Sequence, residues 1–328
     1  MKRVNEIMYV RITAMMFVVL YHCYCFYGVW KSPSIYNVSN LPTETVSWAS
    51  AYTTIAKIVN NFTLPTFFFL SGLLYFKYSN RKREDKNALI IFLKKKFIRL
   101  LLPYLVWRLL HYVLPFIPAE AYGHLWFLIT LWWMFMIVEP MRFFWDRINR
   151  DDIKIGVILL LIVMSSSLHL RHFHHFPVDT IFHYLPFFMC GSLFAEKSFH
   201  LQRATIIIFF AGLILFCGTY FCVESWWIYK ITIQLSVISV ISSSLIIASK
   251  FAPPLHLDLL TRVDSCSMGI YIVHRIIIVA LLCYHSIAVL MTRHYIIAPL
   301  CLFIIVFAIS WTLVVALKRV KYINFIIG

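Results

Sequence analysis

The sequence contains few charged residues, few glycines and very few acidic side chains for its length. Only 13% of the 328 residues are charged, against roughly 25% in an ordinary globular domain. A soluble fold of this size would expose large apolar patches, so a soluble protein is excluded. The nine glycines and the lack of any repeat exclude fibrous chains. Because 61% of the residues are hydrophobic and 17% are aromatic, disorder is excluded too.

The hydrophobic residues gather in runs that are long enough to cross a membrane. A spanning helix needs about 20 mostly apolar residues. We expect ten such helices, at residues 8–30, 52–77, 100–118, 124–141, 155–170, 181–196, 204–222, 227–248, 266–285 and 295–317. The loops between them are too short to hold a soluble domain. The sequence therefore predicts an all-α, polytopic membrane bundle, with residues 1–328 forming one transmembrane domain.

The distribution of basic residues predicts the orientation of the chain. Thirty Lys and Arg against 14 Asp and Glu give a net charge of +16. If the N-terminus is cytoplasmic, 23 of the 30 basic residues fall in the inner segments, as the positive-inside rule requires. We therefore expect both termini inside. The charge is then explained by insertion, and no nucleic-acid partner is expected.

The first predicted helix carries two ionisable residues on one face. Arg11 and His22 are 11 residues apart, which separates them by about 20° around a helix and about 16.5 Å along it. Ionisable groups within a span are costly and usually functional. Taken by itself, Arg11 is compatible with a snorkelling anchor at the membrane surface. Taken by itself, His22 is compatible with a buried histidine that is hydrogen-bonded to a neighbour. Their alignment favours two ends of one shared path.

The ninth predicted helix carries a polar stripe. Asp264, Ser267, Tyr271 and His274 follow one another at steps of three and four residues, so they share one helical face. Such a stripe would be costly against lipid, so we expect it to face the bundle interior or a wet cavity. Arg275 follows on a neighbouring face and needs a partner that the sequence does not identify.

Further polar residues are candidates for the same site or for contacts between helices. The third and fourth predicted helices add Arg108, His111 and His124. The loop 77–99 ends in Lys94, Lys95, Lys96 and Arg99, a basic cluster that suits either anionic lipid or the phosphates of a cytosolic ligand. No metal is expected, because the histidines at 169, 172, 174 and 175 do not match a standard site.

Six motifs occur in the order found in one known family. They are Arg11-x10-His22, Pro65-Thr-Phe-Phe-Phe-Leu-Ser-Gly72, Lys96-Phe-Ile-Arg99 leading into Pro103-Tyr104, His124-Leu-Trp-Phe-Leu128, Tyr184-Leu-Pro-Phe-Phe-Met-Cys-Gly191 and Ser267-Met-Gly-Ile-Tyr-Ile-Val-His274. The chain resembles the integral-membrane acyltransferase-3 family, which includes O-acetyltransferases of bacterial surface glycans. It departs from the family in having Lys96 where Arg is frequent, and it resembles the stand-alone members that lack a fused hydrolase-like domain.

The resemblance implies transfer of an acyl group, usually acetyl, from cytosolic acetyl-CoA to a hydroxyl of a surface or lipid-linked carbohydrate. It implies a multi-pass protein of the bacterial inner membrane, with acyl-CoA as a substrate and no permanently bound cofactor. His22 would act as general base or transient acyl carrier, with Arg11 and His274 as further catalytic residues. Lys96 and Arg99 would bind the CoA phosphates. The acceptor side would involve His124, Tyr271 and Arg108.

Two other functions fit the sequence. A transporter or flippase of a lipid-linked glycan would also line its route with buried polar residues. Transporters often contain repeated halves, and none is visible in this sequence, which favours the enzyme. A non-catalytic membrane partner in a glycan assembly complex is the third alternative.

Overall fold

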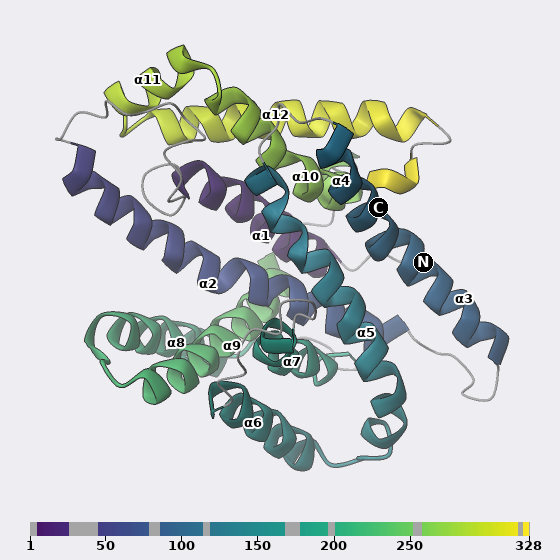
Figure 1. The fold of residues 1–328 in the computed structure, drawn as a ribbon. Coiled ribbons are helices and arrows are strands. Elements are labelled where there is room, and N and C mark those ends of the chain that lie inside the picture. Colours follow the sequence, from purple (N-terminus) through teal and green to yellow (C-terminus); the bar gives the residue numbers. More distant parts are fainter. Residues whose placement is uncertain are drawn as a thin grey trace. The chain divides into compact units, whose positions relative to one another are not determined.

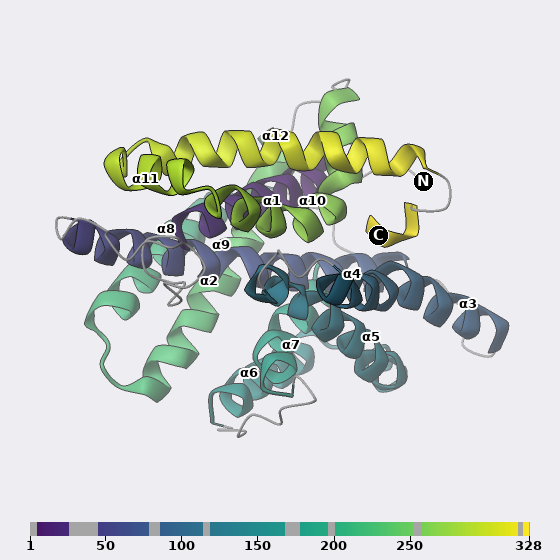
Figure 2. The same cartoon turned by 45° about the horizontal axis from the view of Figure 1, so that its top comes forward.

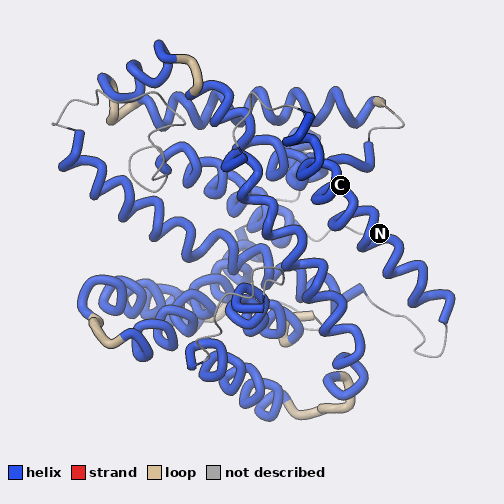
Figure 3. The backbone as a smooth tube through the Cα atoms, viewed as in Figure 1, coloured by secondary structure: helices blue, strands red, loops and turns tan. Residues whose placement is uncertain are grey.

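The computed structural model describes residues 5–25, 45–78, 86–113, 119–167, 178–195, 201–251, 258–320 and 324–327. All regular structure in these ranges is helical (Figures 1 and 3). The α-helices are α1 (Asn5–Tyr24), α2 (Thr45–Tyr78), α3 (Lys86–Lys96), α4 (Leu102–Val113), α5 (Trp126–Trp145), α6 (Asp151–Ser167), α7 (Val178–Ser192), α8 (Arg203–Cys222), α9 (Trp226–Phe251), α10 (Asp258–Leu282), α11 (His285–Arg293) and α12 (Ala298–Arg319). Three short elements complete them: the π-helix η3 (Phe97–Leu101) and the 3-10 helices η4 (Ala119–Leu125) and η5 (Asn324–Ile327). The predicted all-α class is confirmed for the described residues.

Seven helical segments are long and apolar enough to cross a membrane. They are Glu6–Tyr24, Ala51–Tyr78, Ala121–Trp145, Arg203–Cys222, Trp226–Phe251, Asp258–Leu282 and Ala298–Arg319. The other three predicted spans overlap α4, α6 and α7, whose described lengths of 12, 17 and 15 residues are short for a full crossing. The count of ten and the N-in, C-in orientation therefore stay predictions.

The longest helix continues through a proline. α2 has 34 residues and contains Pro65. Proline removes one backbone donor and crowds the carbonyl four residues earlier. Membrane helices tolerate such an interruption where neighbouring groups satisfy the freed carbonyl, and α5 and α7 also run through internal prolines, Pro140 and Pro186.

The chain divides into two compact units. The first unit contains residues 1–11, 64–92 and 129–258, and the second contains 12–63, 93–128 and 259–328. Single helices, among them α1, α2 and α5, contribute to both. The expectation of one domain over the whole chain stays a prediction.

In the first unit, α8 and α9 form an antiparallel hairpin, which Figure 2 shows side by side, and α6 packs on α7 and α9. Ile207 and Ile214 of α8 are 66% and 73% exposed. Exposed side chains that are this apolar suit contact with lipid.

The first unit also contains a very close helix crossing between α2 and α7. A Cβ placed on Gly72 would overlap the Phe188 carbonyl, and one placed on Gly191 would overlap the Phe69 carbonyl. Small residues allow backbones to approach in this way when lipid supplies no hydrophobic drive for association. Gly72 on α2 and Gly191 on α7 therefore form the two sides of this close approach.

Helix α10 forms much of the core of the second unit. Thirteen of its residues are buried, from Val263 to Leu282. Asp264, Tyr271 and His274 are among them, and Ser267 is half-buried with its hydroxyl donating to the Asp264 carbonyl at 2.8 Å. The polar stripe predicted on this helix therefore faces the protein interior, as expected.

Candidate functional site

Three histidines from distant parts of the chain meet inside the second unit. His22 comes from α1, His124 from η4 and His274 from α10. The ring centroids of His274 lie 4.9 Å from those of His22 and 5.1 Å from those of His124, and the other two rings are 6.0 Å apart. All three side chains are buried, and His274 is 0% exposed. We call these residues the histidine cluster.

Two of the rings are joined directly. His274 Nε2 lies 3.1 Å from His22 Nδ1, across 252 positions of sequence. His274 Nδ1 lies 3.1 Å from the Ile270 carbonyl oxygen, and His22 Nδ1 lies 2.9 Å from the Val18 carbonyl oxygen. A carbonyl oxygen only accepts, so each Nδ1 facing one carries the proton. His274 Nε2 then accepts from His22.

The two carbonyls thereby determine where the lone pair of His22 lies. A neutral imidazole has one protonated and one unprotonated nitrogen. With its proton at Nδ1, shared between Val18 and His274, neutral His22 has its lone pair at Nε2. An imidazole oriented in this way can accept a proton at Nε2 or be acylated there.

His124 is placed differently from the other two histidines. Its Nε2 lies 2.9 Å from the Ile272 carbonyl oxygen of α10, and its Nδ1 lies 3.1 Å from the Ala121 carbonyl oxygen. The hydroxyl of Tyr271 donates to the His124 carbonyl at 2.5 Å. A neutral imidazole has one N–H and donates to only one of these carbonyls; with the proton at Nε2, His124 bonds η4 to α10.

Arg275 lies beside the same cluster. Its guanidinium occupies the space next to Gly123, where a Cβ would lie 3.2 Å from Nη1. Arg275 directly follows His274 and Gly123 directly precedes His124, so the guanidinium lies next to the cluster. The structure therefore supplies surroundings for Arg275 that its sequence position did not reveal. Gly123, the residue before His124, leaves room for this guanidinium, and the sequence did not indicate that function.

The basic candidates lie on a helical rod formed by α3, η3 and α4. Lys96 ends α3, and Arg99 lies in the π-helical η3, where it is exposed. Arg108 is exposed on α4. Proline at 103 cannot donate to the Arg99 carbonyl, and its ring would crowd that carbonyl in an α-helix. A wider turn directly before Pro103 relieves this conflict, which explains why Arg99 lies in a π-helix.

Arg11 and His22 lie on one continuous helix, α1, as expected. Arg11 is half-buried and belongs to the first unit, whereas His22 belongs to the second. The side chain of His111, the histidines at 169, 172, 174 and 175, and the basic residues Arg81–Arg83 lie outside the described part of the structure.

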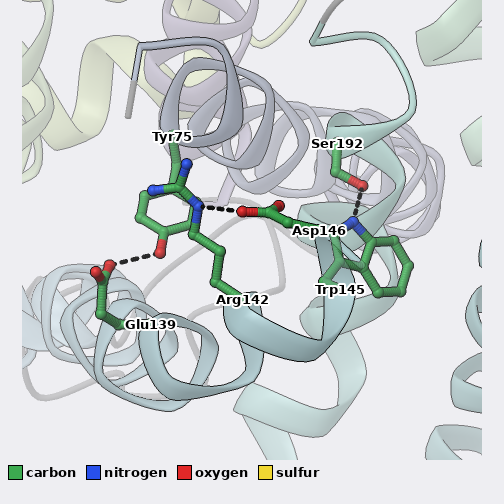
Figure 4. Close-up of polar contacts among 6 residues, drawn as sticks. All are labelled: Tyr75, Glu139, Arg142, Trp145, Asp146 and Ser192. Carbon is green, nitrogen blue, oxygen red and sulfur yellow. Dashed lines mark hydrogen bonds and ion pairs between the residues drawn. The ribbon is translucent and has the colours of Figure 1, made fainter. Parts of the chain in front are cut away.

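A polar network in the first unit was not predicted from the sequence (Figure 4). The Tyr75 hydroxyl donates to Glu139 Oε2 at 2.5 Å, Arg142 Nε pairs with Asp146 Oδ2 at 3.1 Å, and the Trp145 indole donates to Ser192 Oγ at 3.0 Å. These residues come from α2, α5, α7 and the turn after α5.

The Tyr75 ring joins this network to an aromatic cluster. It lies 5.6 Å from Phe135 and 5.9 Å from Phe188, measured between ring centroids. The available signal was Glu139, an acidic residue within an apolar run. Its partner on α2 could not be found from spacing, because 64 residues separate them.

The comparisons with known proteins place the chain in a family. The model of an acyltransferase domain, that of acyltransferase-3, matches residues 4–315. This match includes the complete histidine cluster and the rod that carries Lys96 and Arg99. The comparisons with curated proteins and with solved structures found no match. The chain therefore belongs to the acyltransferase-3 family of membrane proteins.

Proposed function

We propose that this protein transfers an acyl group, in the first place acetyl, from cytosolic acyl-CoA to a hydroxyl of a surface or lipid-linked carbohydrate. Membership of an acyltransferase family supports acyl transfer. The observation that carries the proposal is the place of His22 in the buried histidine cluster, where Val18 and His274 engage its Nδ1 and orient the ring.

The proposed step is a general-base reaction at His22. A sugar hydroxyl is a weak nucleophile, so removing its proton during attack lowers the barrier. His22 Nε2 takes the hydroxyl proton while the hydroxyl oxygen bonds to the thioester carbonyl carbon. The carbon–sulfur bond then breaks, and His22 returns the proton to the leaving CoA sulfur. In a variant of this scheme, Nε2 itself takes the acyl group, and the sugar hydroxyl attacks the acyl-imidazole.

The neighbours of His22 have supporting roles in this proposal. His274 Nε2 accepts the hydrogen bond from the His22 Nδ1–H and thereby positions the His22 ring. Arg275 brings a positive charge close to the cluster, which suits stabilisation of the oxyanion that forms on the thioester carbonyl. His124 and Tyr271 hold η4 against α10 and so shape the acceptor side.

The basic residues provide the donor side. Lys96 and Arg99 lie on consecutive helical segments and would bind CoA phosphates through charge-assisted hydrogen bonds. Arg11 would extend this path along α1, whereas Arg108 of α4 would belong to the acceptor side. With the predicted topology, the acyl group crosses from a cytosolic donor to an acceptor at the outer face of a bacterial inner membrane.

The test is replacement of His22 in the cell. We expect His22→Ala to lower glycan O-acetylation at least about 100-fold, which is the usual contribution of a general base, while the protein still inserts at the normal level. Acetylation is measured by NMR of the purified surface glycan, and His294→Ala, a change at an exposed histidine, serves as control.

The outcomes of this test separate the candidate functions. Normal acetylation in His22→Ala would overturn the proposed chemistry. Loss of the glycan from the surface, instead of presence of an unacetylated glycan, would indicate a flippase. Acetylation that depends on the presence of the chain but on none of the cluster histidines would indicate a non-catalytic partner.

A further inference from the structure

The 3-10 segment Asn324–Ile327 packs against three elements of the second unit. It contacts α4, α12 and the π-helical η3, and in Figure 2 it lies beside the mark of the C-terminus. Two contacts hold it in place: the Trp107 indole N–H of α4 donates to the Ile326 carbonyl at 2.9 Å, and the Ile327 side chain is fully buried. We call this segment the strap.

The strap also reaches the helix that carries His274. A Cβ on Gly269 of α10 would lie 2.6 Å from Val314 Cγ1 and 3.4 Å from the Ile327 Cβ. The missing side chain at Gly269 therefore makes room for α12 and for the strap. Gly269 is five residues before His274, which is about 7.5 Å along the helix axis.

On its other side, the strap contacts the segment that carries Arg99. In η3 the Leu102 N–H donates to the Phe97 carbonyl, five residues earlier. Such wide turns are rare and occur frequently at functional sites. Leu100 of η3 is buried while Arg99 is exposed, so packing on one side of the turn determines where the arginine lies on the other.

We propose that the strap positions η3 against α10, so that Trp107 and Ile327 are positioning residues for the binding of the donor by Arg99. This inference rests on the proposed function, in which Arg99 binds a phosphate of acyl-CoA. The strap is then the physical connection between the donor-binding segment and the helix of the histidine cluster.

The kinetic test uses Trp107→Phe, which keeps an aromatic side chain but removes the indole N–H that bonds to the Ile326 carbonyl. We expect the KM for acetyl-CoA to rise about 3- to 10-fold, as for the loss of one hydrogen bond, with kcat nearly unchanged. Trp311→Phe is the matched control, because the buried Trp311 indole N–H makes no hydrogen bond within the described residues. An unchanged KM, or an equal rise in Trp311→Phe, would overturn the proposal.

A second measurement needs no substrate. We expect backbone hydrogen exchange at residues 97–101 to become faster in Trp107→Phe and in Ile327→Ser, and to stay unchanged in Trp311→Phe. If the wild type transfers no acyl group from CoA, the proposed function fails while this exchange still tests the strap. Equal exchange in all four proteins shows that the strap does not hold η3.

Discussion

The ring of His274 is restrained at both nitrogens, one by the Ile270 carbonyl and the other by His22. Because both of its nitrogens are engaged, His274 has none left to bind a substrate. Its contact with His22 instead orients the His22 ring. The contacts distinguish the three histidines: His22 is engaged at Nδ1, His274 contacts His22 through Nε2, and the ring nitrogens of His124 face two segments of backbone. Residue type alone could not separate these roles, since all three are buried histidines.

The first residue-scale prediction concerns His274. We expect His274→Ala to lower kcat about 100-fold, because misplacement of a reacting group by about 1 Å has an effect of this order. His274→Gln should recover part of the activity, since the amide oxygen of glutamine can accept the hydrogen bond from the His22 Nδ1–H. Both are measured as acetyl transfer from acetyl-CoA in proteoliposomes. Equal activity of the alanine and glutamine variants would contradict a positioning role.

The second residue-scale prediction concerns Tyr271. Tyr271→Phe removes the hydroxyl that donates to the His124 carbonyl and should destabilise the protein by about 1 kcal/mol, a typical net value for one hydrogen bond. The effect is measured as a lower melting temperature in detergent. Tyr284→Phe is the control, because Tyr284 is 65% exposed. A melting temperature equal to that of the control would show that this bond contributes nothing to stability.

At this scale the sequence predicted the chemical groups but not how they meet. His22, His124, His274 and Tyr271 were expected from their positions in apolar runs. Their mutual contacts span up to 252 positions, and helical periodicity contains no information on such pairs. Arg275 shows the same limit: its charge was visible in the sequence, whereas its place beside Gly123 depends on tertiary packing.

At the scale of elements, the crossing of α2 and α7 depends on backbone contact at two glycines. Gly72 and Gly191 lie against carbonyl groups of the opposite helix, so no side chain separates the two backbones. The small residues Ser71 and Gly72 on α2 are compatible with such a contact. Its counterpart on α7 was not identified from the sequence, because Gly191 follows an apolar run that is equally compatible with contact with lipid.

The three shorter helices α4, α6 and α7 show a related limit. Hydropathy detects apolar runs, but it does not show where a helix ends.

Substitution at this crossing provides an element-scale prediction. Gly72→Ala should destabilise the protein by about 1–3 kcal/mol, the usual result of overpacking, because its Cβ would overlap the Phe188 carbonyl. Gly156→Ala is the matched control, since no atom lies within 4 Å of a Cβ there. Melting temperatures in detergent report both changes. Similar melting temperatures in the two variants would mean that the helices separate without cost.

At the scale of the whole molecule, the predicted ten-span topology with both termini inside would place 23 of the 30 basic residues on the cytoplasmic side, as the positive-inside rule requires. We expect a topology reporter fused after Arg83 to be cytoplasmic and one fused after His172 to be external. The reporters are read by their compartment-specific activity in intact cells. The reverse pattern would require an outer donor site, and both reporters on one side would require a different number of spans.

The site described above is assembled from α1, η4 and α10, so its histidines lie up to 252 positions apart in a chain of 328 residues. Proteins are synthesised from the N-terminus, and early segments fold before later ones exist. His22 enters the membrane among the first residues, but His274 is the last member of the cluster to leave the ribosome. The contact between His22 and His274 therefore cannot form in a nascent chain before α10 is inserted. If the proposed chemistry takes place at this cluster, a product truncated before α10 has an unassembled site and is inactive.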